Sequence, residues 1–71
     1  MNKMIAKNLP TADQLDEMSP RTARIWLNRL YELAPEVVEA IWSATSIASP
    51  SAGPVRVLRE VVFHFSEESA S

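Results

Sequence analysis

One stretch decides the fold of this chain: residues 19–34, which read SPRTARIWLNRLYELA. Ser19 is a residue type favoured at a helix N-cap, and Pro20 suits the first helical position because the N–H that it lacks has no partner there. The residues that follow predict an amphipathic helix, because apolar side chains recur on one face of a period of about 3.6 residues. The apolar face holds Ala23, Trp26, Leu27, Leu30, Leu33 and Ala34, and the opposite face holds Arg21, Arg24, Asn28 and Glu32.

A shorter helix is predicted just before this one. Thr11 and Gln14 have the spacing of a capping box, in which each side chain accepts a hydrogen bond from the other residue's backbone N–H. We expect this helix to cover 12–18 and to end there, because Pro20 disfavours helical geometry at the residue before it. Residues 1–10 are interpreted as a flexible arm.

A third helix is predicted from Pro35 to about Ala48. Pro35 either kinks or restarts a helix, and Glu36 favours a new start because an acidic side chain complements the positive end of the helix dipole. The apolar residues of this segment span an arc of roughly 200°, wider than the ~100° stripe that a surface helix needs against one core. Val38 and Trp42 lie at the margin of this arc. We therefore expect the core to leave both side chains uncovered, and we expect both to contact a second subunit or another protein.

The last element, over 55–65, fits two patterns. Its apolar residues can form one face of a helix, but its β-branched and aromatic residues also suit a strand. Charge order opposes the helix, because Arg56 and Arg59 lie near its start and Glu67 follows its end, the reverse of what the dipole favours. A lone strand would need a partner strand from a second subunit, so the helix is the preferred interpretation. Residues 66–71 are predicted to be a frayed tail.

The size of the chain predicts self-association. At 71 residues it forms at most one domain, whose burial barely offsets the conformational entropy lost on folding. The chain has no cysteine and a single histidine, His64, which excludes disulfides and predicts neither a metal nor another cofactor. A second subunit is the remaining ordinary source of stability. We expect an all-α, homodimeric bundle of three to four short helices.

Charge and hydropathy bear on the partners and the location that we expect, and a cytoplasmic location without membrane contact is the default expectation. The formal net charge of −2 argues against binding nucleic acid or anionic membranes by bulk electrostatics. No apolar run approaches the ~20 residues that span a bilayer. Asn2 and Lys3 interrupt the first residues, which lack the apolar centre of a secretory signal.

Residues 19–30 also carry a functional pattern. Their sequence, SPRTARIWLNRL, resembles the recognition helix of winged-helix and related helix-turn-helix regulators, in which Ser-x-x-Thr-small precedes basic residues, Leu and Asn. The resemblance implies that Arg21, Arg24 and Asn28 contact base edges and phosphates in the major groove. These three residues share a face about 60° wide. DNA binding through the 19–34 helix is therefore one functional hypothesis.

Catalysis is not expected. His64 lies close to Ser66 and Glu67 in sequence, but no pair of nucleophile and base can be assigned. Gly53 is the only glycine, so the chain has no glycine-rich phosphate loop. The carboxylates are explained by helix starts and exposed helix faces.

Three large aromatic residues support the other hypothesis, which is protein binding. Trp26, Tyr31 and Trp42 belong to residue types enriched at interface hot spots, although Trp26 also fits an ordinary core position. Together with Val38, they form the predicted protein interface. The first hypothesis is thus a small regulatory or adaptor protein that binds another protein, and helix-turn-helix DNA binding is the alternative.

Overall fold

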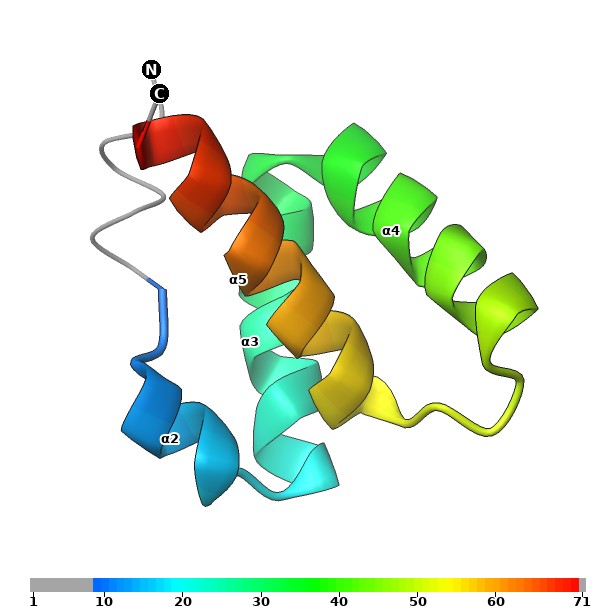
Figure 1. Ribbon diagram of the computed structural model, residues 1–71, viewed down its shortest axis with the longest axis horizontal. Helices are drawn as coiled ribbons and strands as arrows, with labels where there is room; N and C mark the ends of the chain where they lie inside the picture. The colour runs from blue at the N-terminus through cyan, green and yellow to red at the C-terminus, as the bar shows by residue number, and fades with distance from the viewer. Residues whose placement is uncertain (1–8, 71) are drawn as a thin grey trace.

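The structure, a computed structural model, describes residues 9–70, with side chains as far as residue 67. This part of the chain folds into helices α2 (Ala12–Asp16), α3 (Pro20–Leu33), α4 (Pro35–Ala48) and α5 (Pro54–Ala70), without a strand (Figure 1). The predicted all-α bundle is confirmed, and the strand alternative over 55–65 is wrong. Most of the arm predicted over 1–10 lies outside the described residues.

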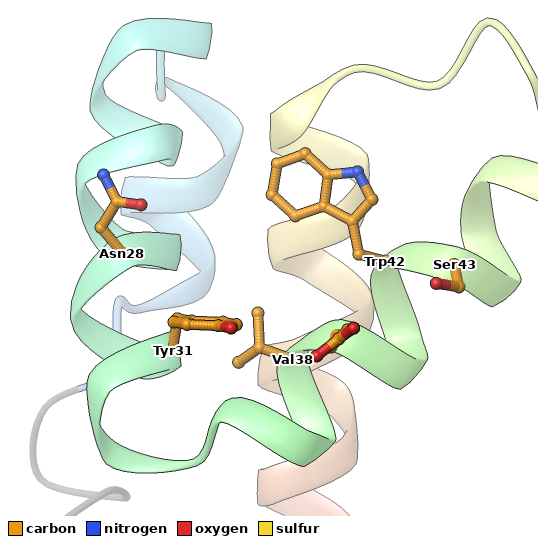
Figure 2. A pocket seen from close by; sticks show the side chains of 6 residues that line it. Asn28, Tyr31, Val38, Trp42 and Ser43 are labelled. Atoms are coloured by element: carbon orange, nitrogen blue, oxygen red, sulfur yellow. The ribbon is translucent and has the colours of Figure 1, made fainter.

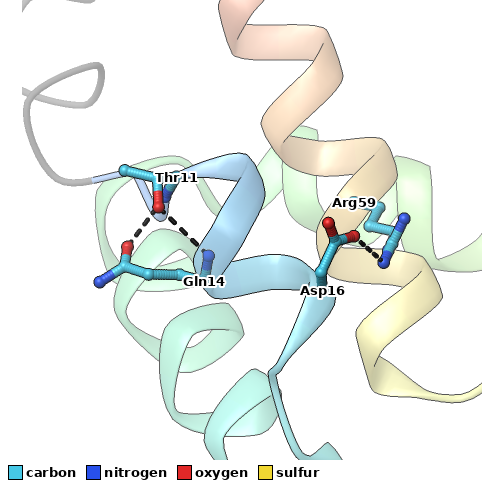
Figure 3. A network of polar contacts seen from close by, with 4 residues as sticks. All are labelled: Thr11, Gln14, Asp16 and Arg59. Carbon is cyan, nitrogen blue, oxygen red and sulfur yellow. Dashed lines mark hydrogen bonds and ion pairs between the residues drawn. The ribbon is translucent and has the colours of Figure 1, made fainter.

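Capping side chains begin the first two helices as the sequence predicts. Thr11 Oγ1 accepts a hydrogen bond from the backbone N–H of Gln14 at 3.2 Å, and Gln14 Oε1 accepts one from the N–H of Thr11 at 2.8 Å (Figure 3). At the start of α3, Ser19 Oγ accepts a hydrogen bond from the N–H of Thr22 at 3.3 Å. Each cap satisfies backbone donors that the first turn of a helix leaves without a partner.

Two helix ends differ from the sequence prediction. Helix α2 ends at Asp16 rather than near residue 18, because Ser19 must be extended to cap α3 and the chain leaves helical geometry before it. Helix α5 continues to Ala70, beyond the expected end at Phe65. The ring of Phe65 is buried and is the last core contact of α5, so the residues after it continue the helix beyond the core, in the segment where a frayed tail was predicted.

Helices α3, α4 and α5 form a three-helix bundle in which each packs against the other two (Figure 1). Helix α2 joins this bundle through Leu15, which is buried, and through an ion pair of 3.0 Å between Asp16 Oδ1 and Arg59 Nη2 (Figure 3). Both partners of that pair are exposed, so burial of Leu15 is the stronger attachment. The buried core consists of Leu15, Ala23, Leu27, Leu30, Val38, Val57, Leu58, Val61 and Phe65.

Val38 is the main correction to the sequence analysis. It was expected to be left uncovered by the core, but its side chain is only 2% exposed, and it is the one fully buried residue of α4. Helix α4 packs on α3 and α5 through a face on which Val37 and Ile41 are partly buried. Val38 lies within this face because the crossing of the helices, and not the width of the apolar arc, decides which part of α4 is covered.

Leu33 also departs from the prediction. The sequence places it on the apolar face of α3, whereas half of its side chain is exposed. Ala23, Leu27 and Leu30 define the buried stripe of α3, and Leu33 lies roughly 90° from the centre of that stripe at about 100° per residue. The predicted apolar face was therefore wider than the face that the bundle covers.

No described helix has the length and hydropathy needed to cross a bilayer.

Candidate protein-binding groove

A groove between α3 and α4 brings together several residues that the sequence analysis singled out. Its volume is about 370 Å³, and Figure 2 shows the side chains of its walls. Tyr31 and Trp42 are 47% and 42% exposed, respectively, and both point into the space between the two helices. The lining consists of Asn28 and Tyr31 from α3 and of Val38, Glu39, Trp42 and Ser43 from α4.

The groove arises from the way the chain turns between these helices. Ala34 leaves helical geometry with φ −146° and ψ 71°, and Pro35 begins α4 directly after it. The two helices then diverge from this tight connection (Figure 2). Val38 lies near the connection, where it is covered, whereas Trp42 lies one turn further on, where the helices are farther apart. An indole at this point lines the gap between the helices and stays partly exposed.

The chemistry of the groove is apolar with a few polar groups. The rings of Tyr31 and Trp42 supply large apolar surfaces. The amide of Asn28 and the hydroxyl of Ser43 can donate and accept hydrogen bonds, and Glu39 is the only charged residue in the lining. Such a site can bind an apolar side chain, form hydrogen bonds with a peptide backbone and attract a positive charge.

Trp26 does not belong to this groove. It is partly buried against the core on the side of α3 that faces α2, and the guanidinium of Arg29 lies 5.9 Å from the centre of its ring. Of the four predicted interface residues, Tyr31 and Trp42 therefore lie together, and Val38 forms the buried floor between them. Trp26 lies elsewhere.

The three predicted DNA-binding residues are all exposed, but they are not equivalent. Asn28 lines the groove between α3 and α4. Arg21 and Arg24 lie outside it, and neither forms an ion pair within the described part of the chain. A variant that changes all three residues would thus alter two surfaces at once.

Among the described side chains, no group of three His, Asp or Glu residues lies close enough together to hold a metal ion. The ring of His64, for which the sequence predicts no catalytic role, packs edge-on against Phe65 with ring centres 5.4 Å apart.

Glu39 and Ser43 are groove residues that the sequence analysis did not identify. Glu39 lies three residues before Trp42, and Ser43 lies directly after it. Both are on the polar side of Trp42, which lies at the edge of the apolar arc of α4. Polar residues next to an aromatic residue at the edge of an apolar arc could have indicated them.

Comparison with protein-family models, with curated proteins and with solved structures finds no match to this chain. A helical bundle alone does not define an activity, so the chemistry of the groove is the guide to function.

Proposed function

We propose that this protein is a non-catalytic regulatory or adaptor protein of the cytoplasm that binds another protein in the groove between α3 and α4. The observation that carries the proposal is the pair of partly exposed aromatic side chains, Tyr31 and Trp42, that point into the same groove. Contact between the apolar surface of an aromatic ring and water is unfavourable, so burying the ring against a partner stabilises a complex. Aromatic residues are accordingly enriched among the residues that dominate protein interfaces. We further propose that the protein acts as a homodimer.

The shape of the groove favours a protein segment over a small molecule. Its volume of about 370 Å³ is near the lower end of the range of about 300–1,000 Å³ that is usual for small-molecule sites. It is also an open groove that runs along the two helices, and not a closed cavity that could surround a small molecule. Such a groove suits one or two side chains that project from a larger partner.

The lining also specifies the chemistry of the partner. The two aromatic rings fit an apolar side chain, and the Asn28 amide can pair with a peptide group next to it. Glu39 adds a single negative charge at the same place. The partner segment is therefore expected to present a large apolar residue close to a lysine or arginine, because opposite charges stabilise the bound position and orient the segment.

The first prediction tests the groove with a matched pair of variants. Tyr31→Ala should abolish capture of a partner protein that the immobilised wild-type protein retains from an extract of its host, because one aromatic wall is removed. Ile25→Ala is the control, because Ile25 is on the same helix with 51% exposure, close to the 47% of Tyr31, but lies outside the groove. If both variants capture the same proteins as the wild type, the groove is not the binding site.

DNA binding is a second candidate, favoured by one specific observation. Arg21 and Arg24 are exposed on the first half of α3, directly after the short connection from α2. This placement suits a helix that follows the turn of a helix-turn-helix motif and contacts phosphates. The groove proposal has priority because the same placement is also ordinary for charges on the solvent face of an amphipathic helix.

A second prediction distinguishes the two candidates. If α3 binds DNA, random duplex DNA should bind at low salt, and the double variant Arg21→Ala/Arg24→Ala should lower the slope of log affinity against log salt concentration by about 0.9 per lost phosphate contact. If the groove proposal is right, this double variant should keep its protein partner and bind DNA no differently from the wild type. Fluorescence anisotropy of labelled DNA measures both slopes.

A further inference from the structure

The outward face of α5 carries another exposed aromatic residue. Phe63 is 60% exposed and lies opposite the buried stripe formed by Val57, Val61 and Phe65. Arg56, Glu60, Phe63 and Glu67 follow one another at intervals of four, three and four residues, so they share one face of α5. One side of this face adjoins α4, where Glu60, Phe63 and Glu67 line a hollow together with residues of that helix. These four residues are called the α5 stripe below.

The charges of the α5 stripe are ordered against the dipole of their own helix. Arg56 lies in the first turn of α5 and Glu67 in the last part, whereas a helix favours acidic residues at its start and basic residues at its end. The same order is favourable toward a neighbouring antiparallel helix. In such a pair, Arg56 lies beside the C-terminal end of the other helix, which carries the negative end of the helix dipole and Glu67 of the partner subunit. Glu67 likewise lies beside the positive N-terminal end of the other helix.

We propose that two copies of this chain associate through their α5 stripes, antiparallel and about a two-fold axis between Glu60 and Phe63. The spacing of the four residues is symmetric, at four, three and four residues. In an antiparallel pair, position 56 of one chain therefore lies opposite position 67 of the other, and position 60 lies opposite position 63. Arg56 then faces Glu67 of the partner subunit, and the symmetry creates this ion pair twice. A parallel arrangement would place like charges opposite each other at every charged position of the stripe. The antiparallel arrangement brings only the two Glu60 side chains near each other, and each of these is paired with Arg56 of its own helix.

A hollow on this face fits the aromatic residue of the second copy. Arg56, Arg59, Glu60 and Phe63 line a depression of about 350 Å³. In the antiparallel register, the ring of Phe63 from the partner subunit lies over Glu60 and so enters this depression. The side chains of Arg56 and Glu60 form an exposed ion pair of 3.4 Å at its edge, so a guanidinium is already in place to stack on the incoming ring.

Positions 60 and 63 are about 4.5 Å apart along the helix, so the two Phe63 rings lie side by side across the axis. Each ring thereby loses much of its contact with water.

This interface supplies a surface for the proposed homodimer and does not depend on the groove. The α5 stripe shares no residue with the lining of the α3–α4 groove. A dimer formed through α5 therefore leaves each groove free to bind a partner, and either proposal can fail without the other.

The third prediction is a charge-reversal test by sedimentation equilibrium at micromolar concentration. The wild-type protein should sediment at twice the chain mass of 7.9 kDa. Arg56→Glu and Glu67→Arg, made singly, should each raise the dimer dissociation constant at least about tenfold, because each places like charges opposite each other at two symmetric positions. The double variant Arg56→Glu/Glu67→Arg should dimerise at least about threefold more tightly than either single variant, because both pairs between the subunits are restored with reversed sign. It should stay weaker than the wild type, because the Arg56–Glu60 pair and the stacking guanidinium are lost.

Three controls accompany this test. Arg24→Glu changes the net charge as Arg56→Glu does, but on α3, and it should leave the dimer intact. Trp42→Ala should also leave it intact, since it alters only the groove. Phe63→Ala should weaken the dimer without unfolding the chain, because its ring contributes little to the core, and circular dichroism verifies the fold of each variant.

A wild-type protein that sediments as a monomer would overturn the proposal. So would a dimer that withstands both single charge reversals, or one that Trp42→Ala dissociates. Loss of the dimer in both single variants without recovery in the double variant would exclude the antiparallel register.

Discussion

Leu30→Ala is expected to lower the free energy of unfolding by about 2–5 kcal/mol, the usual cost of truncating a buried leucine to alanine. Leu30 is 1% exposed at the centre of the buried stripe of α3, the helix that packs on both α4 and α5. A domain of this size has a total stability of only about 5–10 kcal/mol. The variant should therefore show a large fall in its urea midpoint, measured by circular dichroism, or fail to fold.

Leu33→Ala is the matched control for this experiment. It makes the same substitution one turn later on the same helix, at a side chain that is 50% exposed. It should cost about 1 kcal/mol or less, because much of the leucine already contacts water. Equal urea midpoints for the two variants would contradict the packing of α3 described above.

Trp42→Ala is expected to weaken binding of the groove's partner by about 2 kcal/mol or more, roughly 30-fold in the dissociation constant. The physical reason is that the indole supplies a large apolar surface that the partner would remove from water. Calorimetric titration with the partner captured by the wild-type protein measures the change. The fold should survive, because Trp42 is 42% exposed and lies outside the buried core.

Ile47→Ala is the control for this second experiment. Ile47 is on the same helix and is 82% exposed, but it does not line the groove. We expect this variant to bind the partner as the wild type does. An equal loss of affinity in the two variants would place the binding surface on the outer face of α4 and contradict the groove.

The groove shows how far sequence reasoning reached toward the candidate site. The sequence identified Tyr31 and Trp42 as interface candidates from residue type and position. It could not show that both border the same space, because they belong to different helices and only the divergence of those helices sets their arrangement. It grouped Trp26 with them for the same reason, although that ring packs on the opposite side of α3.

Helix α5 shows a similar division. Its apolar residues fitted both a helix and a strand, since the local pattern in 55–65 satisfied both periods. The helix gains its advantage from the burial of Leu58, Val61 and Phe65 on one face, against α3 and α4. The exposure of Phe63 follows from the same choice, because in a helix it lies opposite that face.

The sequence by itself determined the features that depend on near neighbours in the chain. Thr11 and Ser19 begin helices through hydrogen bonds to backbone groups three residues away, and Pro35 ends one helix and begins the next through its own ring. Only the tertiary structure decided which apolar residues are covered. Val38 is buried and Trp42 is partly exposed, although they are neighbours on one helix face, because burial depends on the distance to the next helix and not on the period of the pattern.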